Sequence, residues 1–197
     1  MESQQKLSNS DKMMIAAINL ISEKGYNSVT TKEIAEEAGF SEKTLFRHFG
    51  SKQNLLETAF KRFHYSEEMK TLYNEKLVWD LQTDLLLISR KYHELMNRNR
   101  KMIQISIKEA GNLPPGFLET TQEPPKQFLD ILTQYFSRMQ EMGKMIQSKA
   151  DVQALSFMFM NFGAFMNNLD HSSSFTTVSL DEFVTESVQL FARALTP

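Results

Sequence analysis

The chain contains no cysteine and few residues that interrupt regular structure, with 5 prolines and 7 glycines among 197 residues. The absence of cysteine excludes disulfide frameworks and thiolate metal sites. Apolar residues recur at spacings of three and four, and no alternating strand pattern competes with them. The sequence therefore predicts an all-α protein.

Long apolar runs are also missing. The most apolar segment, residues 155–169, is shorter than the roughly 20 residues that a membrane-spanning helix needs, and serine and asparagine interrupt it. The first twelve residues, MESQQKLSNSDK, lack the apolar core of a signal peptide. We therefore expect a cytoplasmic protein that has no membrane partner.

Motifs of catalysis and metal binding are absent as well. The 4 histidines are scattered along the chain. His64 and Glu68 have helical i, i+4 spacing, but two solvent-exposed side chains explain this spacing more simply than a metal site does. The sequence has no G-x-S-x-G, no phosphate-binding glycine loop and no H-E-x-x-H. We expect no catalytic residue, no metal and no cofactor.

Charge is nearly balanced overall but not locally. The formal net charge of −2 argues against a protein that coats nucleic acid through bulk positive charge. Between residues 43 and 62, however, five basic residues accompany a single acidic one, Glu57. Positive charge is thus concentrated in one short segment.

Four helices are expected in the first third of the chain. The first spans about residues 11–24 and ends at Gly25, which suits a left-handed turn. The second begins at Thr30 with a T-x-x-E capping box that includes Glu33. Ser41 caps a third helix of about residues 42–49.

Ser51 caps the fourth helix, which is predicted to continue past Phe63 as far as Leu72. The second and third helices are joined by the short turn AGFS, which is the helix-turn-helix arrangement whose second helix can enter the DNA major groove. In the helix of residues 42–49, Leu45 and Phe49 share the face expected to pack inward. The opposite face carries hydrogen-bond donors for base edges or phosphates: Lys43, Thr44 and Arg47.

The segment TTKEIAEEAGFSEKTLFRHFGSKQNLL, residues 30–56, resembles the DNA-binding module of the tetracycline-repressor (TetR) family of bacterial transcription regulators. The resemblance implies a homodimeric regulator, usually a repressor, whose DNA-binding heads move when a small molecule binds the C-terminal domain. It divides the chain into a helix-turn-helix domain, residues 1–54, and an effector-binding and dimerisation domain, residues 55–197.

Carried over by position, the resemblance also assigns DNA contacts. Base contacts fall on Glu42, Lys43, Thr44 and Arg47. Phosphate contacts fall on Thr31, Ser41, Phe46, His48 and Lys52. Two of these positions depart from the family, because Phe46 lacks the hydroxyl of the tyrosine often found there and Glu42 would repel a phosphate unless it accepts from a cytosine amino group.

Further helices are predicted at about residues 78–97, 100–110, 124–142, 151–169 and 180–195, with an irregular segment at 111–125. The last two helices are expected to pair with their copies in a four-helix dimer interface. The predicted interface residues are Met160, Gly163, Ala164, Asn167, Phe183, Val184, Val188, Phe191 and Leu195.

The abundance of phenylalanine and methionine suggests an adaptable apolar pocket. The candidate lining residues, each of which a packed core would also explain, are Trp79, Met102, Phe117, Phe128, Tyr135, Met158 and Phe165. The expected partners are therefore a double-stranded DNA operator, a small hydrophobic effector and a second copy of the chain.

Two functions remain open at this point. The first is a repressor released from a palindromic operator when its effector binds. The second is a helical carrier of hydrophobic ligands, or a dimeric interaction module, without specific DNA readout. Glu42, Phe46 and the nearly neutral N-terminal region support the second.

Overall fold

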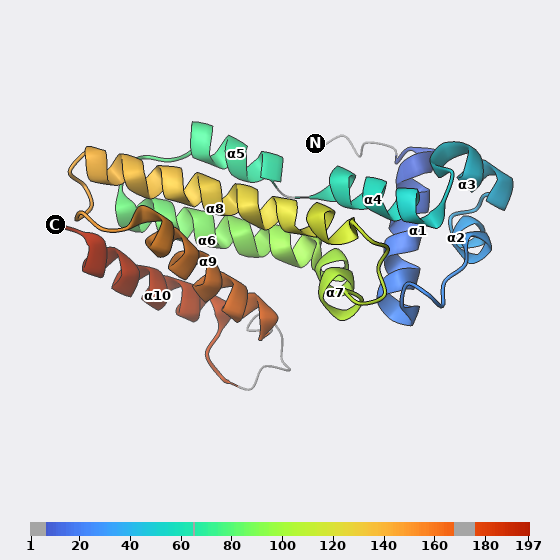
Figure 1. Cartoon of the computed structure of the whole chain (residues 1–197). Coiled ribbons are helices and arrows are strands. Elements are labelled where there is room, and N and C mark those ends of the chain that lie inside the picture. Colours follow the sequence, from blue (N-terminus) through green and yellow to red (C-terminus); the bar gives the residue numbers. More distant parts are fainter. Residues whose placement is uncertain (1–6, 65, 168–175) are drawn as a thin grey trace, which may run out of the picture. The chain divides into compact units, whose positions relative to one another are not determined.

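The computed structural model describes residues 7–64, 66–167 and 176–197, and in these parts it contains helices and no strand (Figure 1). The predicted all-α class is confirmed. In chain order the helices are α1 (Asn9–Lys24), α2 (Thr31–Glu37), α3 (Glu42–Phe49), α4 (Lys52–Phe63), α5 (Ser66–Glu75), α6 (Leu81–Arg98), α7 (Arg100–Lys108), α8 (Phe117–Glu141), α9 (Ala150–Met166) and α10 (Leu180–Leu195).

The helices form two compact units. Unit 1 comprises Met1–His64 and Asn99–Glu123, and unit 2 comprises Tyr65–Arg98 and Pro124–Pro197. This division differs from two consecutive domains separated after residue 54, because α4, α7 and the first residues of α8 belong with the N-terminal helices. Sequence order alone conceals this arrangement, since α7 is separated from α1 by the whole of α5 and α6.

A shared apolar core explains why α7 belongs to unit 1. Met102 and Ile105 of α7 are buried in the same cluster as Ile21 of α1, Ile34 of α2 and Leu45 of α3. The start of α8 contributes as well, since the buried ring of Phe117 meets the ring of Phe60 edge-on at 5.0 Å. Burial of such side chains stabilises each by about 1.5–3 kcal/mol relative to exposure.

Local hydrogen bonds set the ends of α2 and α3. Thr30 and Glu33 form the predicted capping box at the start of α2, and Ser41 and Ser51 cap α3 and α4 as predicted. At the end of α2, Gly39 has a φ of +79°. Its N–H donates to the Glu36 carbonyl at 3.0 Å while the Phe40 N–H donates to the Ala35 carbonyl at 2.8 Å, which is a Schellman motif. These bonds fix the tight turn between the two helices.

The long fourth helix predicted to reach Leu72 is wrong. Helix α4 ends at Phe63, and His64 has an extended backbone with φ −71° and ψ 162°. Helix α5 begins at Ser66 and has its own buried residues, Met69 and Leu72. The apolar spacing continues across the break, so periodicity did not reveal it.

The predicted irregular segment at residues 111–125 is also partly wrong. Helix α8 begins at Phe117 and contains Pro124 and Pro125 in its interior. Each proline lacks an N–H, so the helix forgoes two backbone hydrogen bonds there. Phe117 and Phe128, on either side of the prolines, are both buried. The division between the two units falls between Glu123 and Pro124.

Unit 2 is built on contacts of α6 with α9 and α10, and of α5 with α6. Its interior includes a buried polar group, the carboxylate of Asp84. This carboxylate accepts hydrogen bonds from the Tyr135 hydroxyl at 3.0 Å and from the Val78 N–H at 2.9 Å. The indole of Trp79, whose φ is +60°, stacks on the Tyr135 ring at 5.9 Å.

Candidate nucleic-acid interface

Helix α3 has one face in the core and one face in solvent. Leu45 is fully buried, whereas Lys43, Phe46, Arg47 and His48 are exposed. Phe46 is 46% exposed, which is unusual for a phenylalanine on a short helix and leaves its ring available for contact. The free face therefore combines two cationic side chains with one aromatic ring.

Ser41 and Thr44 lie together at the N-terminus of α3. The Ser41 hydroxyl accepts from the Thr44 N–H at 3.3 Å, and the two side-chain hydroxyls lie 2.9 Å apart. Ser41 is exposed and Thr44 is half-buried. The start of α3 thus offers hydroxyl groups and the positive end of a helix dipole to an approaching anion.

Thr31 and Glu42, predicted to contact phosphate and base respectively, bond to each other. The Thr31 hydroxyl donates to a Glu42 carboxylate oxygen at 2.6 Å, so the start of α2 is tied to the start of α3. The distance is short for such a bond, as expected when the acceptor is ionised. Both side chains are half-buried, and the bond links the first turns of α2 and α3.

His48 lies at the C-terminal end of α3 near the start of α1. Its ring nitrogen Nδ1 is 3.3 Å from the Ser10 hydroxyl, and its ring is 6.1 Å from that of Phe49. The imidazole remains exposed. It can reach a phosphate next to the helix through its other ring nitrogen.

Lys52 was predicted as a phosphate contact, but its ammonium group is bonded inside unit 1. The nitrogen Nζ donates to the Tyr26 carbonyl at 2.6 Å and to the Val29 carbonyl at 2.7 Å. It also lies 4.1 Å from the centre of the Tyr26 ring. Burial lowers the pKa of the Lys52 ammonium, and the nearby Glu33 carboxylate partly opposes that effect.

Sequence reasoning missed Glu109, which follows α7. Its carboxylate accepts from the Tyr26 N–H at 3.0 Å and from the Asn112 amide at 3.3 Å. Gly25, with a φ of +84°, leaves room for it, because a Cβ at this position would lie 3.3 Å from both carboxylate oxygens. No signal in the sequence connects Glu109 with Tyr26, which lies 83 residues away.

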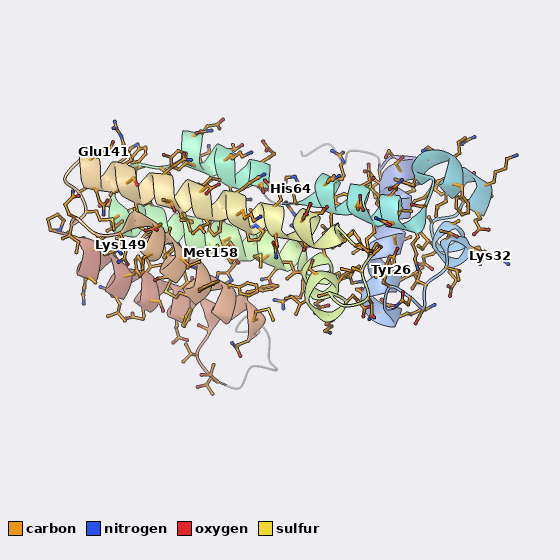
Figure 2. All side chains as sticks on the ribbon, viewed as in Figure 1. Tyr26, Lys32, His64, Glu141, Lys149 and Met158 are labelled. Atoms are coloured by element: carbon orange, nitrogen blue, oxygen red, sulfur yellow. The ribbon has the colours of Figure 1, made fainter. Side chains whose placement is uncertain are left out.

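The seven pocket candidates are not gathered into one place. Met102 and Phe117 are core residues of unit 1, whereas the other five belong to unit 2. Phe128 is buried and stacks on Tyr92 at 5.0 Å, and Tyr135 is buried against Trp79. Phe165 is also buried, while Met158 of α9, labelled in Figure 2, is half-buried.

Two clefts of the described residues are lined by other side chains. A cleft of about 320 Å³ in unit 2 lies between α5 and α8 and is lined by Lys70, Tyr73, Asn74, Gln127, Asp130, Ile131 and Gln134. A smaller one of about 150 Å³ in unit 1 is lined by Ser106, Ala110, Leu113, Pro114, Pro115, Gly116 and Thr121. The larger cleft is lined by polar side chains together with Tyr73 and Ile131, and neither cleft is lined by any of the seven candidates.

The predicted dimer-interface residues divide into two groups. Ala164, Val184, Val188 and Leu195 are at most 5% exposed and lie in the chain's own core, so within one copy they leave little surface for a partner. Met160, Gly163, Phe183 and Phe191 are half-buried, and Asn167 is exposed. The predicted set therefore combines residues of the core with residues that keep surface available for a partner.

Another face of α9 is apolar and exposed. Val152, Leu155, Phe159 and Met166 share this face, and Phe159 is 58% exposed. Leu190 of α10 is 67% exposed. The spacing of the four α9 residues places them along one stripe of the helix.

Comparison with known proteins decides the family. The model for bacterial regulatory proteins of the tetR family matches residues 14–59. The uncharacterized HTH-type transcriptional regulator YvkB of Bacillus subtilis (strain 168) is 31% identical over 184 residues, which cover 93% of this chain and 95% of YvkB. The chain belongs to the TetR family. It is thus a DNA-binding transcriptional regulator, and the helix-turn-helix in α2 and α3 is the DNA-binding motif of that family.

More distant TetR-type relatives agree with this assignment. The biofilm operon negative regulator IcaR of Staphylococcus aureus (strain Newman) is 24% identical over 152 residues, covering 76% of this chain and 79% of IcaR. The crystal structure of AibR in complex with isovaleryl coenzyme A and operator DNA has the same fold, with a TM-score of 0.70 and 18% identity over 93% of this chain and 97% of AibR.

Two features, a membrane-spanning helix and a metal-binding cluster, are absent from the residues that the structure describes. Within 7–64, 66–167 and 176–197, no helix has the length and apolar character needed to cross a membrane. In the same three ranges, no cluster of three or more histidine, aspartate or glutamate side chains is arranged to bind a metal ion.

Proposed function

We propose that this TetR-family regulator is a homodimeric repressor that acts in the cytoplasm and leaves its operator when a small hydrophobic or amphipathic effector binds unit 2. The observation that carries the proposal is the free face of α3, where exposed Lys43, Phe46 and Arg47 lie opposite the buried Leu45. A rigid helix that presents donors outward suits base reading in the major groove.

Each residue of that face has a distinct role in the proposal. Arg47 and Lys43 donate to guanine O6 and N7, the acceptors that such side chains prefer. Thr44 donates to a base edge or a phosphate beside the helix start. Phe46 contacts thymine methyl groups through its exposed ring, which replaces the phosphate contact of a tyrosine hydroxyl.

Phosphate contacts come from the two edges of α3. Ser41 and the first N–H groups of α3 bind a phosphate at one edge, and His48 binds one at the other. Thr31 and Glu42 act on α3 through their mutual 2.6 Å hydrogen bond, so in this proposal they orient the helix and make no contact with DNA.

The exposed apolar stripe of α9 supports dimerisation. A soluble monomer rarely leaves a row such as Val152, Leu155, Phe159 and Met166 in water, because covering it is favourable. A second copy packed on this stripe and on Leu190 of α10 gives a symmetric interface. Symmetry then brings two copies of α3 to successive major grooves, which are about 34–36 Å apart.

Two relatives support repression and ligand control. IcaR is a negative transcriptional regulator, and AibR binds both isovaleryl coenzyme A and operator DNA. By this analogy the effector of the present protein binds better to a conformation that fits DNA poorly, and so lowers operator affinity by linkage.

Selection of binding sites from random duplex DNA at about 0.15 M salt tests the proposal. The full-length protein should recover a motif with two-fold symmetry and half-sites one helical turn apart or a multiple of it. Recovery of no motif by folded, ligand-free dimer would contradict specific readout and favour a carrier of hydrophobic ligands. Extraction of the purified protein for bound small molecules establishes that the dimer is ligand-free.

A further inference from the structure

The backbone of Tyr26 is bonded at both of its polar groups, which belong to the two peptide groups on either side of its Cα. Its N–H donates to Glu109 at 3.0 Å, and its carbonyl accepts from Lys52 at 2.6 Å. Tyr26, labelled in Figure 2, is 9% exposed, and its ring also lies under the Lys52 ammonium. An anionic acceptor and a cationic donor therefore bind the backbone of one residue, at its N–H and its carbonyl, in the turn between α1 and α2.

From this turn, hydrogen bonds and the chain itself lead to α3, the second helix of the helix-turn-helix. Lys52 donates also to the carbonyl of Val29 at 2.7 Å, and Val29 immediately precedes Thr30, the N-cap of α2. The next residue, Thr31, bonds Glu42 in the first turn of α3. A displacement of the turn would therefore shift the starts of both α2 and α3.

We propose that Lys52 and Glu109 form a clamp on the backbone of Tyr26 and are positioning residues for DNA reading. Lys52 acts on DNA affinity through the turn of residues 25–29, and not by neutralising a phosphate. Glu109 secures the same turn from the segment that follows α7. The inference rests on the proposed function, because it names what orients the reading face.

The charges of Lys52 and Glu109 and the room at Gly25 support this clamp. Two short bonds to carbonyls and the aromatic ring leave one N–H of the Lys52 ammonium for other partners. On the other side, Gly25 lets the Glu109 carboxylate approach closely, because a Cβ there would lie 3.3 Å from both carboxylate oxygens. Charge-assisted hydrogen bonds of this kind are about twice as strong as neutral ones.

Operator binding by the full-length protein as a function of salt distinguishes positioning from phosphate contact. We expect Glu109→Ala to weaken binding about 10-fold, which corresponds to the loss of its hydrogen bond to Tyr26, and Lys52→Met, which removes two hydrogen bonds, to weaken binding by about 10-fold or more. The slope of log affinity against log salt should stay at the wild-type value. A slope reduced by about 0.9 in Lys52→Met would show that Lys52 neutralises a phosphate and would overturn its assignment.

Matched variants separate the clamp from general stability. Lys61→Met removes an exposed lysine of the same helix, and Glu119→Ala removes an exposed glutamate of unit 1; both should bind like wild type. Glu109→Gln keeps an oxygen that accepts from Tyr26 and should restore most of the affinity lost in Glu109→Ala. All comparisons are made at a temperature where circular dichroism shows each variant folded.

Hydrogen exchange tests the clamp without DNA. Protection of the Tyr26 amide should fall in Glu109→Ala and in Lys52→Met, because either change lets the turn open locally. Unchanged protection in both would overturn the clamp. If wild-type protein recovers no operator, the proposed function and the positioning role fail together, while exchange still decides whether the clamp exists.

Discussion

At the scale of single residues, several polar side chains of the DNA-binding unit bind protein groups, although their position in the motif pointed to DNA. Lys52 donates to the Tyr26 and Val29 carbonyls, and Glu42 accepts from Thr31. Lys43 and Arg47 remain exposed. A sequence pattern gives the type and position of each side chain, but it does not show which groups that side chain bonds in the folded protein.

Asp84 and Tyr135 provide a residue-scale prediction for unit 2. Tyr135→Phe removes the hydroxyl that donates to the buried Asp84 carboxylate at 3.0 Å, which should destabilise the protein by about 1–3 kcal/mol. Chemical denaturation measures the change in the free energy of unfolding. As a control, Tyr73→Phe alters a half-buried tyrosine of the same unit and should cost less. Equal stability of Tyr135→Phe and wild type would contradict the role given to this bond.

At the scale of elements, caps and turns were the most predictable features. Thr30, Ser41 and Ser51 each accept from a backbone N–H as their spacing indicated, because capping depends on residues within one turn. The break at His64 was missed, since the apolar spacing runs through it. The start of α8 at Phe117 was missed because prolines normally end helices, and here burial of neighbouring aromatic rings overrides that preference.

The capping box of α2 should make its stability depend on pH. Hydrogen bonds from the Thr30 backbone N–H and hydroxyl lower the pKa of Glu33 from 4.5 to about 2, with further help from Lys24. A carboxylate with a depressed pKa stabilises the fold fully above its unfolded pKa. This contribution is lost as pH falls from about 4.5 to about 2.

Comparison with Glu33→Gln measures that contribution. Wild type should be the more stable protein at neutral pH, and the difference should shrink through this acid window in denaturation curves recorded at successive pH values. Glu37→Gln, which changes an exposed glutamate at the other end of α2, should show no such convergence. A difference between wild type and Glu33→Gln that is independent of pH would argue against the capping role.

At the scale of the whole molecule, the all-α class and the position of the helix-turn-helix were predictable, whereas the grouping of helices was not. The capped helices and the spacing of Leu45 and Phe49 are local features. The packing of Met102 and Ile105 with α1 is not, because no local pattern records which distant helix an apolar face meets. For the same reason the sequence did not single out the exposed α9 stripe: periodicity identifies faces, but only tertiary packing shows which one is buried.

The dimer surface proposed on α9 and α10 gives a prediction at this scale. Phe159→Arg places a charge in the middle of the exposed α9 stripe, and burying it without a partner is costly, so the protein should become monomeric at micromolar concentration. Sedimentation velocity measures whether each variant is a monomer or a dimer. Val78→Arg alters another exposed apolar residue outside α9 and α10 and should leave the dimer intact. A dimer that persists in Phe159→Arg would place the interface elsewhere.

The central claim is that the free face of α3 reads the operator, and one comparison tests it most directly. Affinities of wild type, Arg47→Ala and the control Lys61→Ala are measured on the selected operator and on a set of its single-base variants. We predict that Arg47→Ala loses about 1–3 kcal/mol on the operator and no longer discriminates at one base pair of each half-site, whereas Lys61→Ala keeps the wild-type profile. If Arg47→Ala weakened binding to every sequence equally, Arg47 would be a phosphate contact and the reading face would lie elsewhere.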